Sequence, residues 1–112
     1  MAFTITDTIT GNIATFTLVG ELDASAAPAF HEKIETAATA NVKQLVLDLS
    51  NLEYMSSAGL RVLIYAKQKM GVGVDIILVG TQPMVQDTLE KTGFNRSVTM
   101  VDSAANIPSA GN

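Results

Sequence analysis

Apolar and polar residues alternate along the first part of the chain. Residues 3–8 alternate in the manner of a half-buried strand. Gly11-Asn12 is typical of a turn, and residues 13–19 are rich in the β-branched and aromatic residues that favour a second strand. We expect the two strands to pair as an antiparallel hairpin, followed by a loop at Gly20-Glu21-Leu22-Asp23.

Three later segments predict further strands. Residues 44–49 are apolar with little alternation at their centre, which is typical of a central strand covered on both faces. Residues 75–79 are almost entirely apolar and predict a second strand of the same kind. Residues 97–101 predict a short last strand.

Between these strands, apolar residues recur at the three- to four-residue spacing of amphipathic helices. We expect Ser25 or a neighbour to cap the first helix, with Pro28 in its opening turn. The second helix is expected from about Ser57 to Met70, and the third from a Thr81 cap to a stop at Gly93. The expected inward positions are Ala27, Phe30, Ile34, Ala37 and Ala38 in the first helix, Gly59, Leu60, Leu63, Ile64 and Met70 in the second, and Val85 and Leu89 in the third.

The order of these elements is strand, strand, helix, strand, helix, strand, helix, strand. Strand–helix–strand units with short connections imply right-handed crossovers between parallel strands. The sequence therefore predicts a single α/β domain with three main helices and a mixed, mostly parallel sheet of about five strands that begins with an antiparallel hairpin. We expect the domain to span residues 1–102 and residues 103–112 to form a flexible tail.

Composition limits the classes of partner. The chain has seven basic and eleven acidic residues, a net charge of −4 and no visible basic patch, which argues against nucleic acid and membrane as partners. It has no cysteine, so thiolate catalysis, disulfides and zinc–thiolate sites are excluded. No signal peptide and no run of about 20 apolar residues is present, and we expect a cytoplasmic protein.

Candidate catalytic groups are few. The single histidine, His31, is predicted on the polar face of the first helix, and the sequence around Ser57 lacks the Gly-x-Ser-x-Gly spacing of a hydrolase nucleophile. A hydrolase would need His31 to lie beside Ser57 as a base. No acidic or histidine cluster has metal-ligand spacing, so no metal or cofactor is expected. We therefore expect a protein that is not an enzyme.

The serine pair before the second helix permits two interpretations. A serine at a helix start is most often a cap that accepts a hydrogen bond from the first turn. The same place, among unpaired N–H groups and the positive end of the helix dipole, also tolerates a phosphate. Gly59 costs about 1 kcal/mol relative to alanine inside a helix, which close approach of another backbone or of a partner would explain. The residues alone leave open whether Ser57 is only a cap or also a switch.

Three segments form a recognisable set. They are Gly20-Glu21-Leu22-Asp23, the Leu-Asp-Leu-Ser-x-Leu-x-Tyr-Met stretch from Leu47 to Met55, and Ser56-Ser57-Ala58-Gly59-Leu60 at the start of the second helix. In motif and element order, from Phe3 to about Val101, the chain resembles the anti-sigma factor antagonists (anti-anti-sigma factors) that define the STAS domain. The resemblance implies the STAS fold, phosphorylation of a serine by an anti-sigma factor that is a serine kinase, and dephosphorylation by a PPM-type phosphatase. The unphosphorylated protein would bind the anti-sigma factor and release the sigma factor for transcription.

Carried onto this sequence, the resemblance implies that Ser57 is the phosphorylation site, with Ser56 as the alternative. It implies a binding module whose partner-binding residues are Glu21, Asp23, Ser56, Ser57, Ala58 and Gly59. We expect a monomer, although the sequence leaves open whether the chain dimerises. Phosphorylation there would add about −1.5 to −2 charges, which a helix start tolerates and a protein interface does not.

The chain departs from the commonest form of the family at two positions. Ser56 stands where that form has an aspartate, and Ala58 stands where it has a second serine or threonine. The lost negative charge beside Ser57 favours an alternative, a constitutive STAS interaction module in a transport or signalling complex, in which Ser57 has no switch role.

Overall fold

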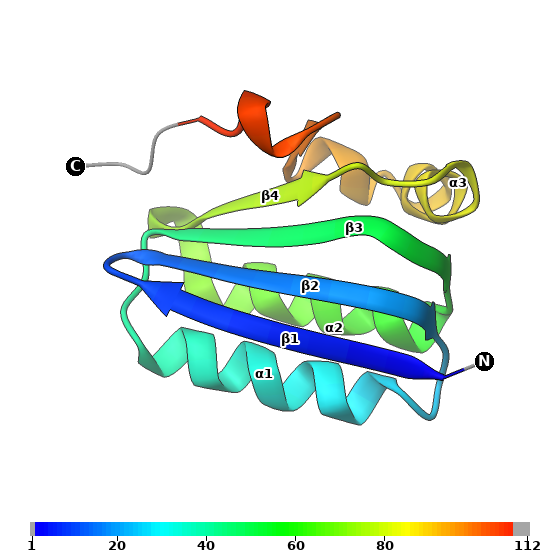
Figure 1. The fold of residues 1–112 in the computed structure, drawn as a ribbon, viewed down its shortest axis with the longest axis horizontal. Helices are drawn as coiled ribbons and strands as arrows, with labels where there is room; N and C mark the ends of the chain where they lie inside the picture. Colours follow the sequence, from blue (N-terminus) through cyan, green and yellow to red (C-terminus); the bar gives the residue numbers. More distant parts are fainter. Residues whose placement is uncertain (1, 109–112) are drawn as a thin grey trace.

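The computed structural model describes residues 2–108 and shows a five-stranded sheet with helices against one of its faces (Figure 1). The strands are β1 (Phe3–Thr10), β2 (Ile13–Leu22), β3 (Gln44–Met55), β4 (Asp75–Val79) and β5 (Thr99–Val101). The helices are α1 (Ala27–Thr39), α2 (Ser57–Met70) and α3 (Pro83–Thr92), with short 3₁₀ turns at Gly71–Gly73, Phe94–Arg96 and Ala104–Asn106.

The strands lie side by side in sequence order. β1 and β2 are antiparallel, and all later neighbours are parallel. This arrangement confirms the predicted hairpin, the mixed, mostly parallel sheet and the three helices. Because each parallel strand returns through a helix, α1, α2 and α3 all begin at the end of the sheet where β2, β3 and β4 finish (Figure 1).

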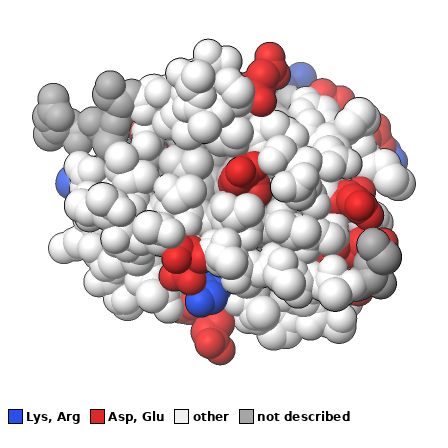
Figure 2. Space-filling model, viewed as in Figure 1, with Lys and Arg blue, Asp and Glu red and all other residues white. Residues whose placement is uncertain are grey.

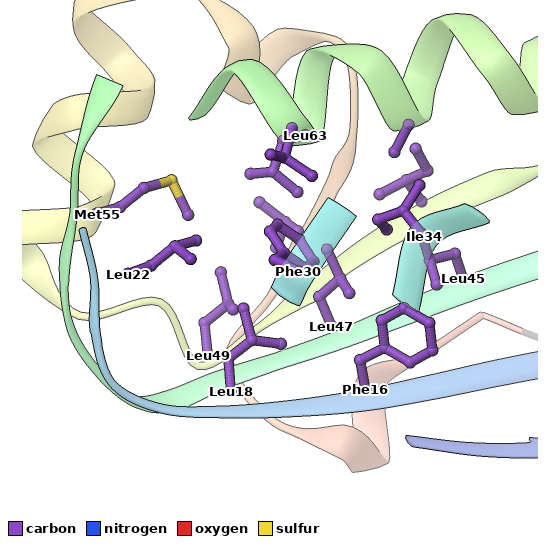
Figure 3. Close-up of a cluster of buried hydrophobic side chains, with 14 of the residues drawn as sticks. Phe16, Leu18, Leu22, Phe30, Ile34, Leu45, Leu47, Leu49, Met55 and Leu63 are labelled. Carbon is purple, nitrogen blue, oxygen red and sulfur yellow. The ribbon is translucent and has the colours of Figure 1, made fainter. Parts of the chain in front are cut away.

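One apolar cluster joins the sheet to all three helices. It contains alternate residues of the central strands, such as Phe16 and Leu47, together with the predicted inward residues Phe30 and Leu63 (Figure 3). The predicted inward residue Leu89 of α3 belongs to the same cluster. The buried positions of α1 are Ala27, Phe30, Ile34 and Ala37, and those of α2 are Gly59, Leu60, Val62, Leu63 and Ala66. Ala38, Ile64 and Met70 are only half-buried, because each lies at the margin of its helix stripe.

Three strands run further than the sequence predicts. β1 ends at Thr10 instead of residue 8. β2 continues through Leu22 and β3 through Met55, so the expected loop at residues 20–23 is wrong except at Asp23. Glu21 pairs with Tyr54 and Leu22 pairs with Met55, after shifts of register earlier in the same strand pair. Burial of Leu22 and Met55 in the core stabilises this extension. In the sequence, Gly20 followed by the polar Glu21 is typical of a loop and gave no sign that the strand continues.

The starts of two helices differ in part from the prediction. The cap of α1 was expected at Ser25 or a neighbour, and the N-cap is the neighbour Ala26, which makes no side-chain capping hydrogen bond. The Ser25 hydroxyl donates to the Asp23 carboxylate, which also accepts the N–H of Ala26 at 3.0 Å. Thr81 does not cap α3 either, since the residue before the helix is Gln82 and the Thr81 hydroxyl oxygen is buried with no hydrogen-bond partner among the described residues. In both helices the N-cap residue, Ala26 or Gln82, makes no side-chain capping hydrogen bond.

The end of the third helix agrees with the sequence. Gly93 ends α3 in the left-handed conformation, and Phe94 folds back into the core as predicted. The last strand begins at Thr99, two residues later than expected.

Within residues 2–108, none of the helices α1, α2 and α3 covers the second face of the sheet. Over β1 and β2 it presents mostly threonine side chains, and the surface in this view is largely uncharged with scattered acidic residues (Figure 2). Over β3 and β4 it is apolar, and Ile107 packs on a small cluster of Val46, Ile77 and Val79. The buried amide of Gln44 donates to the carbonyl oxygen of Pro108 at 2.9 Å. Ile107 and Pro108 of the expected tail therefore contact the sheet, and residues 109–112 lie outside the described part of the chain.

Candidate functional site

The site lies where β2 and β3 end and α2 begins. The parallel pairing of Leu22 with Met55 places the two strand ends side by side, and both side chains enter the core (Figure 3). The N–H of Ser56 donates to the carbonyl oxygen of Leu22 at 2.8 Å, directly after the last strand pair. The end of β2 is thereby fixed against the first turn of α2.

The two serines have different structural roles. Ser56 is the N-cap: its side-chain oxygen accepts the N–H of Gly59 at 3.2 Å, and its carbonyl accepts the N–H of Leu60. Ser57 is the first residue of α2, is exposed, and within residues 2–108 has no side-chain hydrogen bond. The interpretation of Ser57 as a cap is therefore wrong, because Ser56 already occupies the capping position.

Replacement of the cap gives a prediction for stability. Ser56→Ala removes the oxygen that accepts the Gly59 N–H, and we expect the free energy of unfolding to fall by about 1 kcal/mol. Ser56→Asp retains a capping oxygen and should restore stability, and Ser57→Ala should leave it unchanged. Urea unfolding followed by circular dichroism measures all three. An equal loss for Ser57→Ala would contradict the assignment of the cap.

Gly59 is the point of closest contact between α2 and β2. A Cβ built on Gly59 would lie 2.6 Å from Cγ of Leu22 and 3.2 Å from its carbonyl oxygen, well inside contact distance. The close approach expected from a glycine inside the helix is thus to the chain's own strand β2. Because Leu22 also accepts the Ser56 N–H, the strand end cannot shift away from the helix without losing that bond.

Substitution of this glycine should loosen the site. We expect Gly59→Ala to lower the free energy of unfolding by about 1–2 kcal/mol, since overpacking against Leu22 outweighs the gain in helix propensity. Gly73→Ala is the matched control, because a Cβ on Gly73 meets nothing within 4 Å and its φ is not left-handed. If both variants unfold at the same denaturant concentration, the close contact of Gly59 with Leu22 does not require glycine.

The two acidic residues of the expected partner surface lie beside this helix start, on either side of Leu22. Glu21 is half-buried on the last part of β2. Asp23 has a structural role, since its carboxylate accepts the hydroxyl of Ser25 at 2.7 Å and the N–H of Ala26. The Ser25 hydrogen bond, followed by that of Ala26, holds the pKa of Asp23 below its usual range. Asp23 is therefore a fixed negative charge at the start of α1.

The first turn of α2 is suited to an added anion. It contains no acidic residue, and within the described residues the N–H groups of Ser57 and Ala58 have no acceptor. Arg61 is exposed and lies four residues after Ser57, at the spacing that brings side chains together on a helix surface. Helix dipole, free N–H groups and Arg61 all favour a negative group on Ser57.

The geometry does not support a hydrolase at Ser57. His31 was predicted on a solvated face, but it is half-buried and its ring stacks on Tyr65 with ring centres 4.5 Å apart. Tyr65 is eight residues from Ser57, which is about 12 Å along the helix axis. The Tyr65 hydroxyl donates to the Glu35 carboxylate, and this bond raises the pKa of Tyr65. His31 therefore joins α1 to α2 and does not lie beside Ser57 as a base.

The described residues contain no group of three or more acidic, histidine or cysteine side chains arranged to hold a metal ion. Among the same residues, no helix is both long and apolar enough to cross a membrane.

Sequence reasoning missed one residue that builds the site and did not assign the structural role of another. Leu22 was assigned to a loop, although it receives both the Ser56 N–H and the close contact of Gly59. Ser56 was treated as a second phosphorylation candidate, although its hydroxyl caps the helix. The capping preference for the residue just before the helical pattern could have separated the two serines.

Comparison with known proteins assigns the chain to a family. The family model of the STAS domain matches residues 4–107. The chain is 41% identical over 68 residues to BtrV of Bordetella bronchiseptica, named as a candidate anti-sigma factor antagonist, and this match covers 56% of the chain and 59% of BtrV. It is 27% identical to the anti-sigma-F factor antagonist RsfB of Mycobacterium tuberculosis, over 86% of the chain and 79% of RsfB.

A solved structure of another anti-sigma factor antagonist has the same fold as this chain. The anti-sigma factor antagonist SpoIIAA of Bacillus, in its unphosphorylated form, superposes with a TM-score of 0.73 at 25% identity, over 93% of the chain and 91% of SpoIIAA. SpoIIAA has also been solved in its phosphorylated form, which superposes with a TM-score of 0.72. Because the STAS family model matches almost the whole described chain, this protein belongs to the STAS domain family.

Proposed function

We propose that the chain is a non-catalytic antagonist of an anti-sigma factor, and that phosphorylation of Ser57 switches off its binding. One observation carries the proposal: Ser57 is an exposed hydroxyl without a hydrogen-bond partner on the first turn of α2, beside a serine that already provides the cap. The proposed partners are an anti-sigma factor with serine kinase activity and a PPM-type phosphatase.

The proposed docking surface surrounds this hydroxyl. It comprises Glu21 and Asp23 at the end of β2 and Ser56, Ser57 and Ala58 at the start of α2. Gly59, which was also expected to bind the partner, is buried against Leu22 and supports this surface from beneath. These two segments are held as one unit by the Ser56–Leu22 hydrogen bond and by the contact of Gly59 with Leu22. A preformed surface of this kind binds without a large ordering cost.

The names of the relatives support the same function. RsfB and SpoIIAA are both named antagonists of anti-sigma factors, and SpoIIAA exists in phosphorylated and unphosphorylated forms. The free hydroxyl supports Ser57 over Ser56 as the acceptor, because a phosphate on Ser56 would displace its bond to the Gly59 N–H.

Release of a sigma factor tests the proposed function. A fluorescent sigma factor bound to the cognate anti-sigma factor should be displaced by the unphosphorylated chain in a titration followed by anisotropy. Gly73→Ala lies far from the docking surface and should displace the sigma factor as the wild type does. Failure of the wild type to displace it at any concentration would refute the antagonist function.

One observation favours a second function. Ser56 replaces the aspartate of the commonest family form, which removes a charge beside Ser57 and favours a constitutive interaction module in a transport or signalling complex. Such a module would recover a transporter component from cell extract and would bind it equally well as wild type and as Ser57→Asp. The switched antagonist would instead recover the kinase and lose it on Ser57→Asp.

A further inference from the structure

Strand β1 forms one edge of the sheet, and the described chain leaves that edge uncovered. β1 pairs only with β2, over eight residues in continuous register without a bulge. Monomeric proteins commonly protect so long an edge with lysine, proline or a bulge. β1 has none of these, and its one charged residue, Asp7, is paired with Lys33 of α1 at 2.8 Å.

The hairpin turn determines which backbone groups of β1 point outward. Because Gly11-Asn12 is a two-residue turn, Thr10 and Ile13 form a hydrogen-bonded pair. Hydrogen-bonded and non-hydrogen-bonded pairs alternate along antiparallel strands, so the even-numbered residues of β1 bond to β2. The residues whose N–H and C=O groups face the open edge are Phe3, Ile5, Asp7 and Ile9.

We propose that this edge binds a second copy of the chain, with the two β1 strands antiparallel and the sheet continuous across both copies. A two-fold axis through Thr6 places Phe3 opposite Ile9 of the second copy and Ile5 opposite Asp7 of the second copy. All four outward-facing residues then become hydrogen-bonded. A shift of the register by two residues in one direction would place Asp7 opposite Asp7 of the second copy. A shift in the other direction would leave Ile9 unpaired. Charge and hydrogen bonding therefore select one register.

Helix α1 is compatible with this pairing. Its contact from Lys33 to Asp7 identifies the flank that faces the β1 edge. The helix positions on that flank are Ala29 and Thr36, with Ala40 at the end of the helix, and all three are small and exposed. Small side chains allow the α1 helices of the two copies to approach. The two-fold axis also brings the Asp7–Lys33 pairs of the two copies near each other. Because each pair contains one acidic and one basic side chain, each charge has an opposite charge nearby in the other copy.

The proposed dimer is independent of the phosphorylation site. Ser57 lies at the end of β3, which β2 separates from the β1 edge, so both copies would keep an accessible Ser57. The dimer differs from the monomer that the sequence leads one to expect, because the direction of the free edge groups is visible only once the strand pairing is known.

Single cysteines test the register, since the natural chain has none. Thr6→Cys places two thiols opposite each other at the axis, at a Cα separation of about 4.5 Å that a disulfide accommodates. Thr4→Cys is the matched control on the same strand and face, because Thr4 lies opposite Thr8 of the second copy. We expect Thr6→Cys to form a disulfide dimer about tenfold faster than Thr4→Cys under mild oxidation. Equal rates would overturn the register.

Sedimentation measures the dimer without a cross-link. Wild type should approach twice the monomer mass as its concentration is raised, and Ile9→Pro should remain monomeric with an unchanged circular dichroism spectrum. Proline at Ile9 removes only an N–H that faces the edge. Ile9→Lys, which adds a charge to the edge without altering the backbone, should act in the same way. A wild type that stays monomeric at every concentration, or edge variants that dimerise as it does, would overturn the proposal.

Discussion

Phosphorylation of Ser57 should weaken binding to the cognate anti-sigma factor by about 10²- to 4 × 10³-fold. A buried charge left unpaired at an interface costs about 3–5 kcal/mol, and each 1.4 kcal/mol is a factor of ten in affinity. On the protein itself the same group gains about 0.3–1 kcal/mol from the helix dipole. The interface effect is the larger, so binding should be lost while the fold is kept.

Isothermal titration of the enzymatically phosphorylated chain measures this loss, with thermal unfolding of the same sample as the control for folding. Ser57→Asp should also lower the affinity for the anti-sigma factor, but by a smaller factor, because aspartate carries less negative charge than phosphoserine. Ser57→Ala should bind as tightly as wild type. An affinity unchanged by the phosphate would contradict the proposed switch, and a matching loss of stability would show that the effect is unfolding.

Removal of residues 104–112 should lower the free energy of unfolding by about 2–3 kcal/mol. Ile107 would no longer pack on Val46, Ile77 and Val79, and the buried Gln44 would lose its bond to the Pro108 carbonyl. Partial burial of one aliphatic side chain and one hydrogen bond together account for a loss of this size. Denaturant unfolding of the truncated chain measures it.

Two further chains separate the causes of that loss. A chain that ends at Pro108 keeps both contacts and should be as stable as the full chain. Ile107→Ser should show most of the loss, since it removes the apolar contact alone. A truncated chain as stable as the full one would mean that these residues do not contribute to the fold.

Local patterns were sufficient for most of the architecture. The alternation in residues 3–8, the turn at Gly11-Asn12 and the apolar strand near Leu45 depend on neighbours in the sequence, and the predicted hairpin and parallel core are confirmed. The inward residues of α1 followed from helical spacing for the same reason. The start of α2 at Ser57 is also confirmed.

The errors fall where distant segments decide the structure. Leu22 and Met55 extend their strands because they pair with each other, a contact between residues far apart in the chain. The close contact of Gly59 with Leu22 and the contact of Ile107 with β3 and β4 also join residues that are far apart in the sequence. His31 has a polar sequence environment, but a ring from another helix covers it. No local pattern contains this information.

The most direct measurement of the central claim is a map of the phosphorylated residue. Incubation with the cognate anti-sigma factor and ATP, followed by peptide mass spectrometry, should give one phosphate per chain, on Ser57. Ser56→Ala should leave that phosphate in place, and Ser57→Ala should abolish it. A phosphate on Ser56, or one that persists in Ser57→Ala, would contradict the assignment of the exposed first-turn hydroxyl as the switch.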